Sequence, residues 1–289
     1  MTTATPFSLR IFVADGDPDG LRLVDRSNWI GKAVIFPRAL YPKVREREEF
    51  QQTGVYLLIG LRESGTGDQV YIGEGDPVRP RLEQHYASKD FWTKAVFFVA
   101  GPGQLNKAHV QYLEARLIKL AFAAKRVQLE NANTPTEPTL SEADRADMDV
   151  FLGNILGMLP VLGIHAFEQS SAKAEGDSPL FKCRGKGIVA TGRDTAQGFI
   201  VLKDSHAAKD VTPSLKEYFP STCDLRAQLQ ANGVLTEDKD SFRFTQDYTF
   251  TSPSQAAQVV LGRSANGRID WKDASGKTLK ELQEAQAAK

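Results

Sequence analysis

The stretch from Gly54 to Glu74 reads GVYLLIGLRESGTGDQVYIGE and decides the fold predicted for the middle of the chain. Its first part, GVYLLIG, is a nearly continuous run of apolar and β-branched residues, and QVYIGE is a second run of this kind. The segment between them, RESGTGD, is rich in residues that favour turns. We therefore expect a β-hairpin in which Tyr56 and Tyr71 lie on neighbouring strands, either facing one site or packing a sheet face.

The segments after the hairpin alternate between helix and strand patterns. Residues 77–86, PVRPRLEQHY, carry prolines only near the start, where a missing N–H is tolerated, and predict a short helix. Residues 91–100 predict a third strand, and residues 105–126 have apolar residues at helical intervals that indicate a long, substantially buried helix. The SEAD sequence at Ser141 can cap a further helix that runs to about Leu159. The pattern predicts an α+β fold.

The length of 289 residues suggests about two domains. Residues 1–50 predict a β-rich N-terminal extension, and residues 51–168 hold the hairpin and the helices that follow it. Residues 169–180 are small, charged and turn-rich, as in a linker. Residues 181–289 alternate short strand patterns with turns and predict a second, smaller α+β domain.

Composition excludes several classes of protein. Lys and Arg total 36, as do Asp and Glu, so no global positive field attracts nucleic acid and such a partner must be bound locally. Two cysteines are too few for a disulfide scaffold or a zinc ribbon and indicate ordinary thiols in a reducing cytoplasm. No apolar stretch approaches the ~20 residues of a membrane span, and the start of the chain does not resemble a signal peptide. Nothing in the sequence predicts an oligomeric state.

Three side chains suggest chemistry. Arg81 and His85 are four residues apart and so share a helix face, where a guanidinium suits phosphate and an imidazole can move a proton at neutral pH. Glu114 stands between Leu113 and Ala115 in the apolar part of the long helix, where an unpaired carboxylate would be costly to bury. Neighbouring residues on a helix do not face each other, so Arg116 would point away from Glu114. A magnesium ion or the Arg81 guanidinium could satisfy the carboxylate. A purely structural ion pair is the alternative to a functional role.

In this order GVY, YIG, an arginine, a histidine, a glutamate on a helix and a downstream asparagine resemble the GIY-YIG nuclease family. The resemblance covers roughly Gly54 to Asn133. It implies a small antiparallel sheet flanked by helices, and hydrolysis of nucleic-acid phosphodiesters with one divalent metal, Mg²⁺ or Mn²⁺. We expect the nucleic acid to be DNA rather than RNA.

The resemblance also implies a role for each matched residue. Tyr56 and Tyr71 would position or deprotonate the attacking water, Arg81 would steady the phosphate charge, and Glu114 would be the sole protein ligand of the metal. An asparagine would orient the site, and Asn131 is assigned here.

Some assignments stay open. Asn133 qualifies as well as Asn131, and His85 could take the proton in place of a tyrosine, whose unperturbed pKa of about 10 needs nearby positive charge. Glu74 directly after YIG adds a negative charge near the expected phosphate site. The alternative function is therefore a noncatalytic nucleic-acid-binding or interaction module. Retention of Tyr56, Tyr71, Arg81 and Glu114 together argues against it, because binding alone needs no metal-ligating carboxylate.

The C-terminal part carries a resemblance of its own. Residues 251–279, TSPSQAAQVVLGRSANGRIDWKDASGKTL, resemble the signature of a domain of unknown function that often follows GIY-YIG nucleases. As structure, the stretch predicts a capped helix after Ser252, a turn at Asn266–Gly267 and a strand at Trp271.

A basic run near the start of this part points to nucleic acid. Lys182, Arg184 and Lys186, with Arg193 beyond them, can neutralise phosphates without reading sequence. A solvated face is the other interpretation.

Overall fold

The computed structural model describes residues 6–62, 67–168, 179–185, 187–195 and 198–287, and the chain divides into two compact units, Met1–Glu168 and Gln169–Lys289. Each unit has its own sheets, helices and buried apolar core. The predicted α+β class is confirmed. Of the predicted linker 169–180, residues 169–178 lie outside the described residues, and Leu180 already begins a strand.

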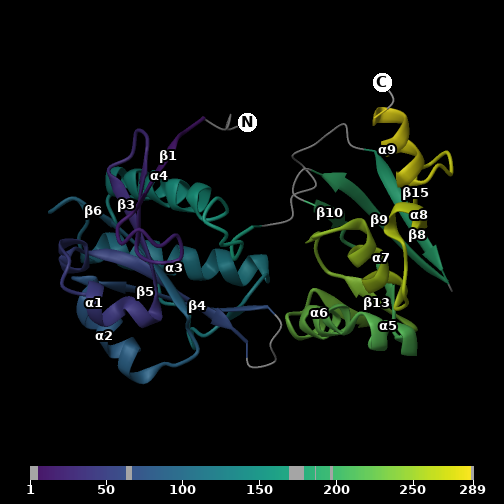
Figure 1. Ribbon diagram of the computed structural model, residues 1–289, viewed down its shortest axis with the longest axis horizontal. Helices are drawn as coiled ribbons and strands as arrows, with labels where there is room; N and C mark the ends of the chain where they lie inside the picture. Colours follow the sequence, from purple (N-terminus) through teal and green to yellow (C-terminus); the bar gives the residue numbers. More distant parts are fainter. Residues whose placement is uncertain (1–5, 63–66, 169–178, 186, 196–197, 288–289) are drawn as a thin grey trace. The chain divides into compact units, whose positions relative to one another are not determined.

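The first unit is built on a seven-stranded sheet (Figure 1). Neighbouring strands are antiparallel except for the last pair, which is parallel and places Gln69 and Val70 beside Gln128 and Leu129. Across the sheet the strands follow the order β1 (Leu9–Val13), β2 (Arg22–Arg26), β3 (Gly31–Pro37), β6 (Lys94–Ala100), β4 (Gly54–Leu61), β5 (Asp68–Gly75) and β7 (Gln128–Leu129).

Helices cover both faces of this sheet (Figure 1). One face packs against α3 (Lys107–Ala124) and α4 (Glu142–Met158) around a large apolar core. The other face packs a second, aromatic-rich core with α1 (Tyr41–Val44) and α2 (Val78–Ser88). The short helix, the third strand and the long helix predicted from the sequence are thus confirmed as α2, β6 and α3. Ser141 caps α4 by accepting a hydrogen bond from the Asp144 N–H at 3.1 Å.

The N-terminal strands belong to the same sheet as the hairpin. β3 pairs with β6 along its whole length, from Gly31 opposite Ala100 to Pro37 opposite Lys94. Side chains on both faces of β3 are buried, so this strand needs cover from helices on both sides of the sheet. Strands β1, β2 and β3 of the predicted N-terminal extension therefore enlarge the small expected sheet, while residues 38–44 and 48–51 form short helices.

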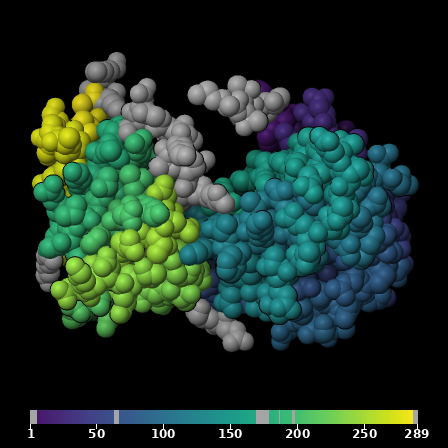
Figure 2. All heavy atoms as spheres, turned by 180° about the vertical axis from the view of Figure 1, so that it is seen from behind, coloured from purple at the N-terminus to yellow at the C-terminus, as the bar shows by residue number. Residues whose placement is uncertain are grey.

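The second unit contains two sheets and five described helices (Figure 1). The larger sheet has the order β14 (Tyr248–Phe250), β10 (Gly198–Val201), β9 (Ile188–Thr195), β8 (Leu180–Gly185) and β15 (Trp271–Lys272). The smaller has the order β11 (His206–Ala208), β13 (Ser241–Phe244) and β12 (Leu235–Asp238). The helices are α5 (Pro213–Tyr218), α6 (Pro220–Ala231), α7 (Pro253–Leu261), α8 (Gly267–Asp270) and α9 (Leu279–Ala287). The last of these, in yellow, lies at one end of the unit in both views (Figure 2).

Local predictions for the second unit hold with one correction. Ser252 caps α7 through the Gln255 N–H, and Trp271 is fully buried in β15, as expected. The predicted turn at Asn266–Gly267 is wrong, because Asn266 is the N-cap of α8 and accepts a hydrogen bond from the Arg268 N–H at 3.1 Å. The Asn-Gly pair at 266–267 favours both a turn and a helix N-cap. Gly267 packs closely on the Pro253 backbone, and this contact favours the N-cap.

Two expectations about the whole chain can be compared with the structure. Both cysteines, Cys183 and Cys223, are free thiols. Among the described helices, none combines the length and the apolar character that crossing a bilayer requires.

Candidate active site

The hairpin places the two tyrosines on one face of the sheet. In the register of β4 and β5, Tyr56 lies opposite Gly73 and Leu58 lies opposite Tyr71. The two phenol rings have centroids 6.3 Å apart and are inclined by 29°. A Cβ atom at position 73 would collide with the Tyr56 hydroxyl, so the glycine of YIG makes room for the first tyrosine.

Helix α2 brings His85 onto both rings. The buried imidazole has its Nε2 atom 2.8 Å from the Tyr56 hydroxyl oxygen, and its ring centroid is 4.7 Å from that of Tyr71. Burial, with the positive charges of Arg81 and Lys89, lowers the pKa of His85 to about 4. His85 is therefore neutral at neutral pH, and one of its ring nitrogens can accept a proton.

We expect a titration by NMR to find the His85 imidazole neutral down to about pH 4. The folded pKa lies below the unfolded value of 6.5, so this group should cost stability as the pH falls from about 6.5 through 4. His85→Gln should remove that part of the pH dependence. A His85 resonance that titrates at 6.5 would contradict the buried placement.

Arg81 lies one turn before His85 and acts on both phenols. Its exposed guanidinium donates from Nη1 to Gln84 Oε1 at 2.9 Å. Burial raises the pKa of Tyr56 and of Tyr71, and the positive charge of Arg81 only partly offsets this effect. Burial prevails, so both phenols are protonated and can donate hydrogen bonds at neutral pH.

Glu114 is half-buried on α3, and its charge reaches both phenols. Burial, then the charge of Glu74, raise the pKa of Glu114 to about 7, while Arg81 and Lys107 act in the opposite direction. Its negative charge raises the pKa of both Tyr56 and Tyr71. Within the ranges that the structure describes, the Glu114 carboxylate makes no hydrogen bond or ion pair. It is a half-buried acid without a partner, which is an unfavourable state for the folded chain alone.

The two protein partners considered for Glu114 can now be compared. Arg116 points elsewhere, as expected: its Nη1 donates to the Tyr112 hydroxyl at 2.6 Å and lies 3.3 Å from Asp149. Arg81 lowers the pKa of Glu114 through space but forms no ion pair with it among the described contacts. The structural ion pair is absent from the described chain, so the carboxylate remains available to a cation.

Glu74 has a partner of its own. Lys107, the first residue of α3, donates from Nζ to both oxygens of the Glu74 carboxylate at 2.6 and 2.8 Å. This ion pair largely neutralises the negative charge that follows YIG. Lys107 is not among the residues predicted from the sequence, although it precedes Glu114 by seven residues, or two helical turns, and so lies on the same side of α3.

Asn131 holds the backbone of β5 rather than facing the phenols. Its amide oxygen accepts from the Ile72 N–H at 3.0 Å, and its Nδ2 donates to the Ile72 carbonyl at 2.7 Å. Ile72 stands between Tyr71 and Gly73, so Asn131 fixes the strand that carries both. It is a positioning residue, and Asn133 is exposed.

We expect Asn131→Ala to lower the free energy of unfolding by about 1 to 3 kcal/mol, because two hydrogen bonds to a strand backbone are lost. Asn133→Ala is the matched control and should change it by less than about 0.5 kcal/mol. Urea unfolding of both variants measures the difference. Equal effects of the two substitutions would contradict the assignment of Asn131.

The donor set suits a hard divalent cation that keeps much of its water. Among the described residues no group of three or more His, Cys, Asp or Glu side chains could hold a metal ion. Mg²⁺ is often bound by one or two carboxylates, with waters and phosphate oxygens completing the shell. A half-buried carboxylate without a partner, beside a second one held by Lys107, fits such an ion.

One comparison with known proteins bears on the second unit. Residues 181–283 match the model of a domain of unknown function, DUF4357. The resemblance of the C-terminal part to a domain of unknown function is thereby confirmed, and the match covers most of the second unit. No nuclease family model matches the first unit, and neither a curated protein nor a solved structure matches the chain.

The basic residues predicted to bind nucleic acid lie at the start of the DUF4357 domain. Lys182 and Arg184 are exposed on β8, while Lys186 lies outside the described residues. They belong to a different unit from the phenols and Glu114.

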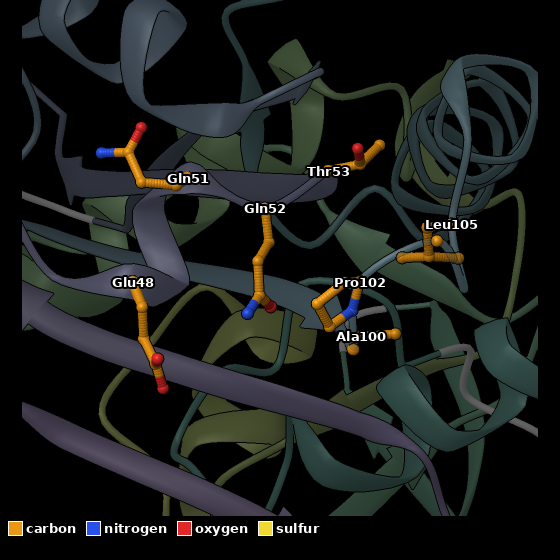
Figure 3. A pocket seen from close by; sticks show the side chains of 9 residues that line it. Glu48, Gln51, Gln52, Thr53, Ala100, Pro102 and Leu105 are labelled. Carbon is orange, nitrogen blue, oxygen red and sulfur yellow. The ribbon is translucent and has the colours of Figure 1, made fainter.

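A cavity of about 400 Å³ in the first unit is lined by none of the predicted catalytic residues (Figure 3). Gln51, Gln52 and Thr53 approach it from the segment before β4, and Glu48 stands at its edge. No lysine or arginine lines it, and the Glu48 carboxylate would repel an anion. It is therefore a poor phosphate site, and we do not place the reaction there.

Proposed function

We propose that residues 51–168 form a metal-dependent endonuclease centre that hydrolyses phosphodiester bonds of nucleic acid, in the manner of the GIY-YIG nucleases that this segment resembles. The observation that carries the proposal is Glu114, a half-buried acid with a pKa raised to about 7 and no partner within the described chain. A phosphate group would contact a cation bound by Glu114 on one side. On the other side it would contact the phenols of Tyr56 and Tyr71 and the Arg81 guanidinium.

Each residue then has a part in the reaction. Arg81, exposed beside both phenols, would donate to the phosphate oxygens and offset their charge. Tyr56 and Tyr71, protonated because they are buried, would orient the attacking water through their hydroxyl groups. His85 lies 2.8 Å from the Tyr56 hydroxyl, so its neutral ring could accept the proton that Tyr56 releases as Tyr56 takes one from the water.

The metal would be held by Glu114 and would supply neutralisation of the charge that develops on the phosphate. Mg²⁺ or Mn²⁺ fits this oxygen ligand, with waters and substrate oxygens as the other ligands.

The ion pair of Glu74 supports the catalytic function over the noncatalytic one. A free negative charge on Glu74, directly after YIG, would repel a phosphate and favour a binding module without catalysis. Because Lys107 holds that carboxylate with two hydrogen bonds, Glu74 does not oppose a phosphate with a free charge.

Cleavage of labelled branched, single-stranded and duplex DNA tests the proposal, with matching RNA substrates alongside. We expect nicks with Mg²⁺ or Mn²⁺ and none with a chelator. Binding of these substrates without cleavage under every metal condition would instead favour the noncatalytic module.

A further inference from the structure

The larger sheet of the DUF4357 domain has a cationic outer face at its β8–β15 edge. Along β8, Phe181 and Cys183 are buried while Lys182 and Arg184 are exposed, as the alternation of a strand requires. The antiparallel register places Lys272 opposite Lys182 and the buried Trp271 opposite Cys183. Lys182, Arg184 and Lys272 therefore point away from the core on one side of the sheet; we call them the β8–β15 face.

A surface hollow of about 540 Å³ lies over this face, lined by all three cations. Two acids, Asp270 and Asp273, also line it, but both are engaged within the protein. Asp270 accepts from Arg263 at 3.0 Å and from the Asn266 N–H at 3.1 Å.

Asp273 closes its own loop by accepting from the N–H groups of Ser275 at 2.8 Å and Lys277 at 2.9 Å. The three cations, by contrast, make no side-chain hydrogen bond or ion pair with any residue that the structure describes. Asp270 is paired with Arg263, Asp273 keeps its charge, and Lys272 also interacts with Glu281, so the three cations outnumber the one unpaired acid that lines the hollow.

The spacing of the cations suits an extended anion. Lys182 and Arg184 are two residues apart on a strand, or about 7 Å at roughly 3.4 Å per residue. Lys272 lies across the strand pair from Lys182, about 5 Å away at the Cα level. A nucleic-acid strand carries a phosphate about every 3.4 Å of duplex axis, so charges at these spacings can contact successive phosphates along its backbone.

The apolar side chains on this face are aliphatic. Val189 lies opposite Arg184 in the register and is 45% exposed, and Ile269 at the hollow is 50% exposed. Neither offers an aromatic ring on which a base could stack, which is the usual device of proteins that grip unpaired bases. Cations beside aliphatic side chains can bind the phosphates of the nucleic-acid backbone but do not recognise the bases, so they confer no sequence specificity.

We propose that the β8–β15 face binds the sugar–phosphate backbone of nucleic acid without regard to sequence, which assigns a binding function to this DUF4357 domain and adds Lys272 to the residues suggested by the sequence. The proposal names the partner of the proposed nuclease, but binding at this face does not depend on cleavage by the first unit.

The test uses the full chain in the presence of a chelator, so that cleavage cannot interfere. Fluorescence anisotropy would measure the Kd for a 25-base-pair DNA duplex and for a duplex of scrambled sequence between 50 and 200 mM salt. The variant combines Lys182→Gln, Arg184→Gln and Lys272→Gln. The matched control combines Lys203→Gln, Lys216→Gln and Lys239→Gln, which removes the same charge from exposed positions elsewhere in the domain.

Three phosphate contacts correspond to a slope of about −2.7 in log K against log salt, or about 40-fold of affinity over this salt range. We expect the face variant to lose that part of the slope for both duplexes while the control retains it. Equal slopes for the two variants would overturn the proposal, as would binding to vesicles of anionic phosphatidylserine but not to DNA. If the separate cleavage assay with Mg²⁺ or Mn²⁺ finds no nuclease activity while the slope difference is intact, the proposed function is rejected and this inference stands.

Discussion

Glu114→Gln is expected to reduce metal-dependent cleavage about 10³-fold or more. The amide keeps the shape of the side chain but removes the charge that would hold a cation beside the phenols. Metal stabilisation of a phosphoryl transition state is worth several kcal/mol, and each 1.36 kcal/mol is a factor of ten in rate. Single-turnover cleavage of the best DNA substrate measures the effect.

Asp147→Asn is the matched control, since it removes an exposed carboxylate from α4 of the same unit and should leave the rate unchanged. Equal cleavage by wild type and Glu114→Gln would mean that Glu114 is not the metal ligand.

The same substitution has a readout that does not need activity. The folded pKa of Glu114, about 7, lies above its ordinary 4.5, so the folded chain holds a proton that the unfolded chain releases between these values. Stability should therefore fall as the pH rises from about 4.5 through 7. Because the carboxylate is only half-buried, we expect Glu114→Gln to recover on the order of 1 to 2 kcal/mol at pH 8 without metal.

A divalent cation should reverse this penalty in the wild type. Mg²⁺ binds the ionised carboxylate of the folded chain and should raise the Tm of the wild type at pH 8, but not that of Glu114→Gln. The same Mg²⁺-dependent rise in both proteins would place the metal elsewhere.

Arg81→Ala is expected to reduce cleavage about 10²- to 10³-fold, the usual effect of removing one donor to a developing oxyanion. Arg81 is exposed, and its guanidinium interacts with Gln84 and with the hydroxyl groups of both phenols, so we expect a modest loss of stability with the fold intact. Arg81→Lys keeps the charge but loses the planar fork, and should recover part of the rate.

Arg145→Ala, at an exposed position of α4, is the control for loss of a guanidinium from the same unit. The salt dependence of substrate binding should weaken with Arg81→Ala and stay unchanged with Arg145→Ala. If Arg81→Ala cleaves at the wild-type rate while its fold is intact, Arg81 does not contact the phosphate.

The elements that form the site could be predicted from the sequence because each depends on local pattern. The runs around Tyr56 and Tyr71 are apolar and β-branched, and the residues between them favour a turn, so the hairpin follows from a window of about twenty residues. The prolines at the start of α2 and Ser141 at the start of α4 likewise act within one helical turn. The isolation of Glu114 from Arg116 followed from helix geometry alone.

Contacts between distant residues could not be predicted in this way. Lys107 neutralises Glu74 across 33 positions, and Asn131 holds Ile72 across 59. The choice between Asn131 and Asn133 depends on which one reaches the open edge of β5, and no local pattern encodes that. The three N-terminal strands join the hairpin through β6, which the chain reaches only some 60 residues later.

The sequence by itself therefore determined where this protein has strands and helices and which side chains could carry chemistry, because backbone propensity and apolar periodicity operate over a few residues. Only the tertiary structure decided that Glu114 has no partner in the described chain, that Glu74 has one, and that Lys272 lies beside Lys182. These properties arise from burial and from charges brought together by packing. Neither exists until distant segments of the chain meet.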